Sequence, residues 1–316
     1  MSSMTKVASL ARPARRPPEP RLLGRRRTHY LYILPTTLLF VAFVLYPIVS
    51  VVAMSFFSKD SASAGTGPLA NYQAVLTDPI FSTAVVNMAI WAVLTITIQM
   101  VVGGSLAYLI ETHTRRTKAV LRTAFLIPMV TSVSVVAIVW QQFYAPMYGP
   151  LENLLKSIGV SMQGISLLGQ PSTAIYAVIA VNIWMYTGFS MLLYIVGLHR
   201  ISSEILDAAK ADGATGLRLA RHILIPMLAP TTKSLLLLGI IGTLQTFALV
   251  FLMTNGGPNH ASDVFGTQIF RSAFRLNHMG YASALSSITL AIAFALTLLQ
   301  LRVLHTGLSP TGGGNA

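Results

Sequence analysis

The charged side chains best suited to contact another molecule gather in one short segment, residues 201–226. Carboxylate and guanidinium groups occur there at Glu204, Asp207, Asp212, Arg218 and Arg221. Charges of both signs at this spacing can form charge-assisted hydrogen bonds with a second protein. Ala208 and Ala209 lie among them, and their small side chains would let the backbone of that protein approach closely. The segment is either a protein-docking surface or a solvated amphipathic loop.

A second set of polar side chains lies inside long apolar runs. Residues 173–198 contain Asn182, Trp184, Tyr186 and Thr187, and residues 234–253 contain Thr243, Gln245 and Thr246. Amides and hydroxyls beside aromatic rings match the hydroxyl rim and the C–H faces of a sugar ring. These side chains are candidates for a sugar path. Alternatively, Asn182 and Gln245 only hydrogen-bond neighbouring helices.

Groupings that support catalysis or metal binding are absent from the sequence. It contains no cysteine, and its seven histidines form no pair at the spacing of metal ligands. Neither a Gly-x-x-x-x-Gly-Lys-Ser/Thr phosphate loop nor a His-Glu-x-x-His zinc motif occurs. We therefore expect a non-catalytic chain that holds no metal or cofactor of its own.

The elements that position these side chains follow from an apolar composition. Of the 316 residues, 53% are hydrophobic and 10% are charged, whereas soluble proteins carry about 25% charged residues. Six runs are long enough to cross a hydrocarbon core as helices: residues 30–57, 80–110, 123–144, 173–198, 234–253 and 281–301. The predicted fold is all-α, a polytopic membrane protein with six transmembrane helices. Pro35, Pro47 and Pro128 are expected to kink these helices without breaking them.

The positive charges predict the orientation of the chain. Eighteen of the 22 Lys and Arg residues lie on the side of the two termini. Positive segments stay in the cytoplasm, so both termini are expected there. The net charge of +13 then reflects the orientation of the chain in the membrane and does not indicate nucleic-acid binding. The Pro- and Arg-rich tail 1–29 is expected to be disordered, and residues 306–316 form a flexible end.

Local signals divide residues 201–226 into two short helices. Ser203 is a suitable cap for the first helix, and Gly213 can adopt the left-handed conformation that ends it. Thr215 or Gly216 then starts a second helix that runs towards Pro226. The sequence predicts a helical elbow on the surface of the protein.

This elbow resembles the coupling motif of permease subunits of ATP-binding-cassette (ABC) importers, in which Glu-Ala-Ala is followed by Gly and, further on, by Pro. Asp207-Ala208-Ala209, Asp212-Gly213-Ala214 and Pro226 match the motif in order. The leading Glu of the motif is Asp207 here, and a commonly aromatic position is Ala220. Other side chains would therefore fill the groove of the ATPase.

Further short matches narrow the resemblance to sugar-type importers, and within them to the larger permease subunit of the maltose transporter. They cover about residues 30–305 and occur in this order: Asn71-Tyr72, Asp78-Pro79, Phe81, Leu126-Ile127-Pro128, Gly149 with Asn153, and Thr254-Asn255-Gly256-Gly257-Pro258. The resemblance implies the type I importer permease fold in a bacterial cytoplasmic membrane. Residues 30–305 would be the permease core, and residues 199–230 its cytoplasmic coupling loop.

The resemblance also implies partners and site residues. The partners are a second permease subunit, two ATPase subunits that bind ATP and Mg, an extracytoplasmic substrate-binding protein and membrane lipid, with no nucleic acid. The residues expected to couple to the ATPase are Glu204, Asp207, Ala208, Ala209, Asp212, Gly213, Ala214, Arg218 and Arg221. Those expected along the substrate path are Asn182, Trp184, Met185, Tyr186, Phe189, Thr243, Gln245 and Thr246. Several of the latter are placed only by alignment with the maltose-type subunit.

The resulting hypothesis is ATP-driven import of a sugar or oligosaccharide by alternating access, coupled through residues 201–226. No Lys or Arg lies in the predicted spans, which favours a neutral sugar over the main alternative, a glycerophosphodiester or glycerol phosphate. No Asp or Glu lies deep in a span, which disfavours a secondary transporter because ion-coupled transport usually needs such groups. A channel that works without an ATPase is the remaining alternative.

The connection from Thr254 to Gly280 is long for a loop outside the membrane. Phe265, Ile269, Phe270 and Phe274 recur in it at roughly helical spacing, with Arg271 and Arg275 between them. This pattern predicts a short interfacial helix that lies on the lipid surface. The family resemblance offers the substrate-binding protein as a second partner for the same helix.

Overall fold

The described part of the chain is helical throughout. The computed structural model describes residues 26–57, 67–111, 115–159 and 165–305, and no strand occurs in these ranges. The predicted all-α fold class is confirmed. The chain divides into two compact units, Met1–Ser50 and Val51–Ala316. Most of the tail predicted to be disordered (residues 1–25) and the predicted flexible end 306–316 lie outside the described residues.

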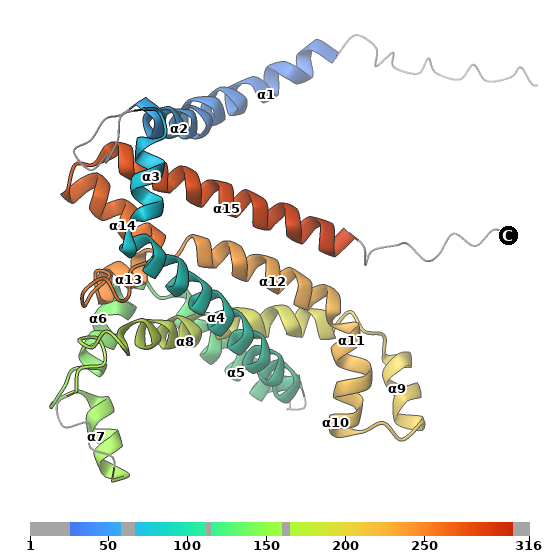
Figure 1. The fold of residues 1–316 in the computed structure, drawn as a ribbon. Coiled ribbons are helices and arrows are strands. Elements are labelled where there is room, and N and C mark those ends of the chain that lie inside the picture. Colours follow the sequence, from blue (N-terminus) through green and yellow to red (C-terminus); the bar gives the residue numbers. More distant parts are fainter. Residues whose placement is uncertain (1–25, 58–66, 112–114, 160–164, 306–316) are drawn as a thin grey trace, which may run out of the picture. The chain divides into compact units, whose positions relative to one another are not determined.

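The first unit contains the start of the first apolar stretch. α1 (Arg26–Phe40) continues through the π-turn η2 (Val41–Leu45) into α2 (Tyr46–Phe57), which crosses into the second unit (Figure 1). α1 begins at Arg26, so the last four residues of the predicted basic tail are helical. Pro47 lacks the N–H that would bond to the carbonyl four residues earlier, and the wide turn η2 directly precedes it. Pro35 and Pro47 therefore lie in a continuous helical stretch, as the sequence predicts.

The second unit is a bundle built around two long helices. α4 (Pro79–Glu111) and α8 (Ala174–Leu198) pack along each other, α5 (Arg115–Val130) packs on α8, and α12 (Ala229–Leu244) packs on α4 (Figure 1). The long helix α15 (Met279–His305) contacts α12. The shorter elements are α3 (Ala70–Thr77), α6 (Val133–Phe143), α7 (Pro150–Ser157), α9 (Ser203–Ala211), α10 (Gly216–Leu219), η3 (Ala220–Leu224), α11 (Ile225–Met227), α13 (Ala248–Met253), α14 (Phe265–Phe270) and η4 (Arg271–Arg275).

Four helices of the described residues are long and apolar enough to cross a membrane as single pieces. They are Tyr32–Phe57, Pro79–Glu111, Ala174–Leu198 and Met279–Gln300. α5 and α6 form a further pair that bends by 95°, and the stretch Gly216–Met227 meets α12 at 65°. The total is six if each bent pair counts as one span. The predicted number of crossings is therefore compatible with the structure, but not every crossing is one helix.

The third predicted run, 123–144, is broken and not merely kinked. α5 ends at Val130, two residues after Pro128, and α6 begins at Val133 after Ser132, whose φ is −58° and ψ is 133°. α5 continues through Pro128, and the break follows it at Thr131 and Ser132. The expectation that this run is one kinked helix is therefore wrong, although the break does not lie at the proline itself.

The fifth predicted run, 234–253, is also interrupted. α12 ends at Leu244 and α13 starts at Ala248, and Phe247 between them has φ −150° and ψ −64°. Irregular backbone at membrane depth is tolerated where it is buried in protein or lines a cavity. The interruption therefore marks a place where such a cavity is to be expected.

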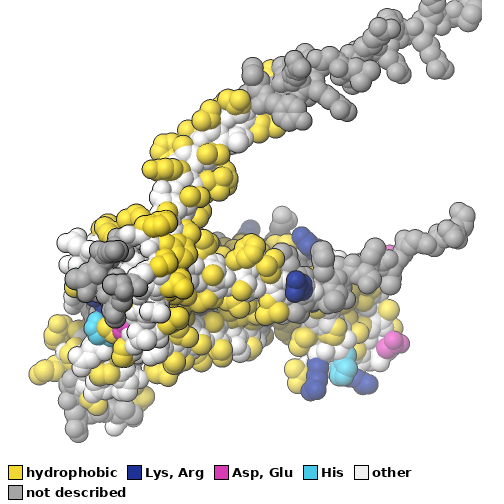
Figure 2. All heavy atoms as spheres, turned by 45° about the horizontal axis from the view of Figure 1, so that its top comes forward, with side chains coloured by type: hydrophobic (Ala, Val, Ile, Leu, Met, Phe, Trp, Pro, Cys, Tyr) yellow, Lys and Arg dark blue, Asp and Glu magenta, His cyan; other side chains and the backbone are white. Residues whose placement is uncertain are grey.

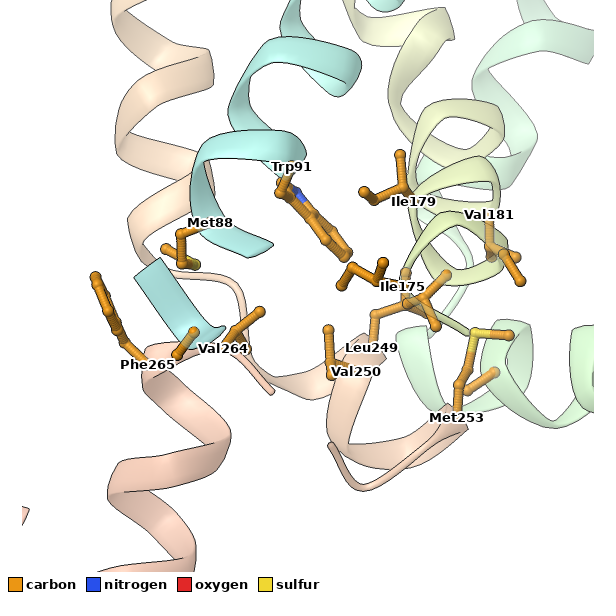
Figure 3. Packing of buried hydrophobic residues seen from close by; sticks show 14 of the residues in the cluster. Met88, Trp91, Ile175, Ile179, Val181, Leu249, Val250, Met253, Val264 and Phe265 are labelled. Carbon is orange, nitrogen blue, oxygen red and sulfur yellow. The ribbon is translucent and has the colours of Figure 1, made fainter. Parts of the chain in front are cut away.

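The buried core lies between α4, α8, α13 and the start of α14. Trp91 of α4 is 2% exposed and points towards Ile175 and Ile179 of α8 (Figure 3). Leu249 and Val250 close the same cluster from α13. This packing connects the two long helices to the short elements that follow the interruption.

Two glycines let the helices of the bundle touch through their backbones. A Cβ at Gly188 of α8 would lie 1.9 Å from the carbonyl oxygen of Phe125 in α5. A Cβ at Gly103 of α4 would lie 2.8 Å from the Cβ of Ser190 in α8. Small residues at such crossings allow the close approach that drives helix association in lipid. α4, α5 and α8 are thus held together as one tightly packed group.

The outer faces of the helices are apolar. Figure 2 shows hydrophobic side chains over most of the visible helical surface, with few charged side chains. Val93, Val101 and Val139 are each more than half exposed. A hydrophobic exterior of this extent is the surface that lipid would cover.

Candidate functional site

A cavity of about 470 Å³ opens at the interruption between α12 and α13. Its size lies in the usual range of small-molecule sites, about 300–1,000 Å³. The wall is formed by residues of α4 and α8, by residues within the segment 235–249, and by Met129 and Val133. α4 contributes Trp91, Thr95 and Gln99, and α8 contributes Asn182, Met185, Tyr186, Phe189 and Ser190. The break in the backbone and the cavity therefore occur at the same place.

Seven of the eight predicted path residues lie in the wall of this cavity. They are Asn182, Met185, Tyr186, Phe189, Thr243, Gln245 and Thr246. The alternative, in which the amides join helices, agrees with a hydrogen bond from Gln99 of α4 to Asn182 of α8. It fits Gln245 poorly, because that residue is exposed. The predicted residues from the two spans do come together in space.

Trp184 is the exception among the predicted path residues. It is absent from the cavity wall and 46% exposed, and its ring packs edge-on against Trp140 at 5.4 Å. Two residues correspond to a rotation of about 200° in an α-helix. Trp184 therefore points away from the face of α8 that carries Asn182.

The cavity wall also contains an amide pair that the sequence prediction missed. Gln99 Nε2 donates to the side-chain oxygen of Asn182 at 3.1 Å and to its backbone oxygen at 3.3 Å. Among the described residues, no protein partner bonds the Nδ2 donor of Asn182 or the Oε1 acceptor of Gln99. The pair thus leaves one donor and one acceptor for a solute. The signal was present in the sequence, because an amide inside an apolar run needs a partner.

The wall of the cavity carries no charged side chain among the residues that the structure describes. Its hydroxyl groups are those of Thr95, Tyr186, Ser190, Thr243 and Thr246, and its aromatic rings are Trp91, Tyr186, Phe189 and Phe247. An uncharged wall favours a neutral solute because a buried ion without a counter-charge is costly. Hydroxyl-rich ligands with apolar faces suit this combination of groups.

The second candidate site is the elbow formed by residues 201–226. α9 ends at Ala211, Gly213 turns the chain with φ +77°, and a second helical stretch starts at Gly216. The predicted pair of short helices is confirmed. The cap position is Ser202 and not Ser203, and no side-chain hydrogen bond caps α9. Figure 1 shows the elbow at one end of the bundle, and Leu206 and Leu219 of the elbow pack against the cluster between α4 and α8.

Most of the predicted coupling residues are on the surface of the elbow. Exposed side chains or backbone are found at Glu204, Asp207, Ala208, Asp212, Gly213, Arg218 and Arg221, and Ala214 is partly buried. Ala209 differs, since it is only 7% exposed and packs inside the elbow. Of the two adjacent alanines, only Ala208 is open to a partner. Leu217, 83% exposed, is an apolar contact that the sequence prediction did not include.

An ion cluster holds the loop that follows α13. Asp263 is fully buried, and Arg271 donates to its two carboxylate oxygens at 2.5 and 2.8 Å. Thr267 donates to the same carboxylate, and Asn87 of α4 donates to the backbone oxygen of Asp263 at 2.9 Å. A Cβ at Gly256 would lie 1.9 Å from Asp263 Oδ1, so the loop needs glycine there.

The predicted helix within residues 254–280 is present as α14 and η4. Phe265 is 3% exposed and stacks on Phe81 of α4, with ring centroids 5.8 Å apart. Phe274, at the other end, is 68% exposed. The helix is therefore anchored in the bundle by one end, and only the part near Phe274 is open to lipid or to another protein.

The short helix α7 carries an isolated ion pair. Lys156 Nζ lies 3.1 Å from Glu152 Oε1, and the backbone N–H of Met147 donates to the other oxygen at 3.2 Å. The hydrogen bond from Lys156 and that from Met147 hold the pKa of Glu152 below its usual value. Within the described ranges, no group of three or more His, Asp or Glu side chains is arranged to hold a metal ion.

Comparison with known proteins identifies relatives over most of the chain. Residues 99–310 match the family described as "Binding-protein-dependent transport system inner membrane component". The chain is 35% identical to the probable ABC transporter permease protein YurN of Bacillus subtilis over 281 residues, which cover 88% of this chain and 96% of YurN. It is 28% identical to the trehalose/maltose transport system permease protein MalF of Thermococcus litoralis, covering 87% of this chain and 92% of MalF.

A solved structure shares the fold. It is a bacterial ABC transporter involved in the import of the acidic polysaccharide alginate, and the matched chain has a TM-score of 0.80 at 22% identity. The match covers 91% of this chain and 98% of that chain. The fold is thus that of an importer permease.

Proposed function

The chain belongs to the family of inner membrane components of binding-protein-dependent transport systems, and we propose that it is the permease subunit of an ATP-driven importer for a neutral sugar or short oligosaccharide. The uncharged cavity at the break between α12 and α13 carries this proposal, because it combines amides, hydroxyls and aromatic rings. The named relatives for trehalose/maltose and alginate support a carbohydrate as the solute.

Energy would come from outside the chain. We infer that two partner ATPase subunits bind ATP and Mg and contact the elbow 201–226, where charged side chains and the apolar Leu217 are exposed. Closure of the ATPase pair would move the elbow and turn the bundle from inward-facing to outward-facing. A second permease subunit and an extracytoplasmic binding protein complete the proposed assembly. This chain itself is expected to be non-catalytic.

The orientation follows from charge. We propose that the elbow and both termini lie in the cytoplasm, because the excess of Lys and Arg supports that orientation. The opposite end, which carries the buried Asp263 cluster, would face the binding protein. A glycerophosphodiester or glycerol phosphate is the second candidate solute, and the absence of a cation from the described cavity wall speaks against it.

ATP hydrolysis by the purified complex tests the proposal. The complex would be reconstituted with candidate binding proteins loaded with maltose, trehalose or a glycerophosphodiester. We expect stimulation by a sugar-loaded protein. Stimulation only by the phosphodiester would retain the importer and overturn the neutral-sugar assignment, and solute uptake without any ATPase subunit would favour a channel.

Replacing Gln99 with leucine is expected to weaken solute binding. The change removes the donor that orients the Asn182 amide. Loss of one such hydrogen bond costs about 0.5–1.5 kcal/mol, or about a 2- to 12-fold change in affinity. Equilibrium binding of radiolabelled sugar to the purified complex measures this effect. Trp184→Phe, outside the cavity wall, is the matched control, and equal affinity of both variants would argue against the pair.

Replacing Gly213 with valine is expected to uncouple uptake from ATP hydrolysis. A Cβ at Gly213 meets no atom within 4 Å, so the effect comes from φ +77° alone, a conformation that β-branched residues rarely adopt. We expect uptake per ATP to fall at least fivefold, measured in proteoliposomes. Gly213→Asn should retain most of the coupling, because asparagine tolerates left-handed backbone. Wild-type uptake in the valine variant would count against the role of the elbow.

A further inference from the structure

A carboxylate with three basic partners lies where α4 and α8 end and α5 begins. Glu111 Oε2 is 2.9 Å from Lys118 Nζ and 3.2 Å from His199 Nε2, and Glu111 Oε1 contacts Arg122 Nη2. Glu111 is the last residue of α4, Lys118 and Arg122 belong to α5, and His199 directly follows α8. The side chain of Glu111 is 19% exposed. One acidic group thus joins three helix ends.

The cluster lies at the base of the elbow. His199 is the first residue of the 199–230 loop, and Leu224 and Leu228 near the end of that loop pack against Ile110 of α4 and Ile195 of α8. Gly197 of α8 lies so close to Thr231 that an added Cβ would be 2.6 Å from its Oγ1. The two ends of the loop therefore meet at the packing interface between α4 and α8, next to Glu111.

The basic groups of the cluster depend on Glu111 for charge compensation. Lys118 and Arg122 lie on one face of α5, four residues apart, where like charges repel. Within the described part of the chain, Nε of Arg122 is buried without a hydrogen-bond partner, so this side chain is already incompletely satisfied. Attraction at a partly buried site is stronger than on an open surface. Loss of Glu111 would leave two uncompensated cations and separate the end of α5 from the other two helices.

We propose that Glu111 is a positioning residue that ties α4 and α5 to the base of the elbow, so that the three helix ends move together when the elbow moves. The proposal rests on the proposed function and adds the group that transmits motion from the elbow to the cavity wall. α4 carries Gln99 and α8 carries Asn182, so both halves of the amide pair belong to the helices that Glu111 joins. Movement of the elbow would then displace Gln99 and Asn182 together.

The test measures solute uptake per ATP hydrolysed in proteoliposomes that contain the complete complex. For Glu111→Gln we expect ATP hydrolysis to persist and uptake per ATP to fall at least fivefold. Glu111→Asp should recover part of the loss because it restores the charge. Lys156→Gln is the matched control, since it breaks the ion pair of α7 without touching the elbow or the cavity.

A purely structural role would lower the amount and the thermal stability of Glu111→Gln but leave uptake per ATP unchanged, and that result overturns the proposal. The double variant Glu111→Gln/Lys118→Gln relieves the repulsion without restoring the link. It should regain stability and stay uncoupled, whereas regained coupling overturns the proposal.

Spin labels give a readout that does not depend on transport. One label replaces the exposed Val120 of α5 and the other replaces the exposed Ile225 of α11. In the wild type we expect the distance between the two labels to stay constant on nucleotide binding, with a narrow distribution. In Glu111→Gln we expect the distribution of this distance to broaden. An equally narrow distribution in both would refute the link. If the wild-type complex shows no binding-protein-stimulated ATP hydrolysis, the proposed function fails instead.

Discussion

Replacing Gly188 with valine is expected to leave no assembled protein. The Cβ would lie 1.9 Å from the carbonyl oxygen of Phe125 and 2.7 Å from its carbonyl carbon. These are backbone atoms of α5, so no side-chain rotation relieves the overlap. α5 would have to move away from α8, and overpacking of this kind costs about 1–3 kcal/mol or more, a large share of a total stability of about 5–15 kcal/mol.

The amount of monodisperse protein extracted in mild detergent measures this effect. Gly104→Ala is the matched control on a neighbouring helix, because its Cβ would be 3.5 Å from the ring of Tyr194, an ordinary contact. We expect the control to give wild-type yield. A monodisperse Gly188→Val protein with an unchanged Tm would show that the close contact between α5 and α8 is not required.

Replacing Asp263 with asparagine is expected to lower the Tm by about 6–20 °C. The carboxylate is fully buried and receives two hydrogen bonds from Arg271. Removing one partner of a buried pair costs about 3–5 kcal/mol, because the remaining charge is left uncompensated, and each kcal/mol corresponds to about 2–4 °C in a chain of this size.

Two further variants make the result specific. The double change Asp263→Asn/Arg271→Met removes both charges and should recover part of the lost Tm. Lys210→Gln breaks the exposed pair with Asp207, and such pairs contribute about 0–1 kcal/mol. If the single and double Asp263 variants melted at the same temperature, the charge of Arg271 would not be the cause.

Hydropathy predicted the spans well but did not predict their internal breaks. Each interruption falls at a pair of polar residues, Thr131-Ser132 in the run 123–144 and Gln245-Thr246 in the run 234–253. Two polar residues in an apolar run do not by themselves distinguish a break from a continuous span. The backbone conformation around Phe247 also depends on its packing. That packing comes from contacts that are distant in sequence.

The cavity residues were predictable as a set but not one by one. Asn182 and Gln245 follow from the cost of an amide in hydrocarbon, and the same rule would have found Gln99. Trp184 was misplaced because composition does not give the rotation of a helix about its axis. Ala208 and Ala209 were both predicted to contact a partner, and only Ala208 is exposed, because adjacent residues of a helix point in directions about 100° apart.

The ion clusters could not be predicted from the sequence. Glu111 meets His199 across 88 residues, and no pattern in the chain places them together. A count of Lys and Arg gives orientation but does not pair charges. Only the packing of α4 against α8 brings these groups into contact.

The uncharged wall of the cavity has an electrical consequence. Moving one elementary charge through a membrane potential of 100 mV changes the free energy by about 2.3 kcal/mol. The described wall carries no charge, so a change between inward- and outward-facing states with a neutral solute moves no net charge at this site. The solute-carrying step would then move no net charge, and its rate would not vary with the membrane potential.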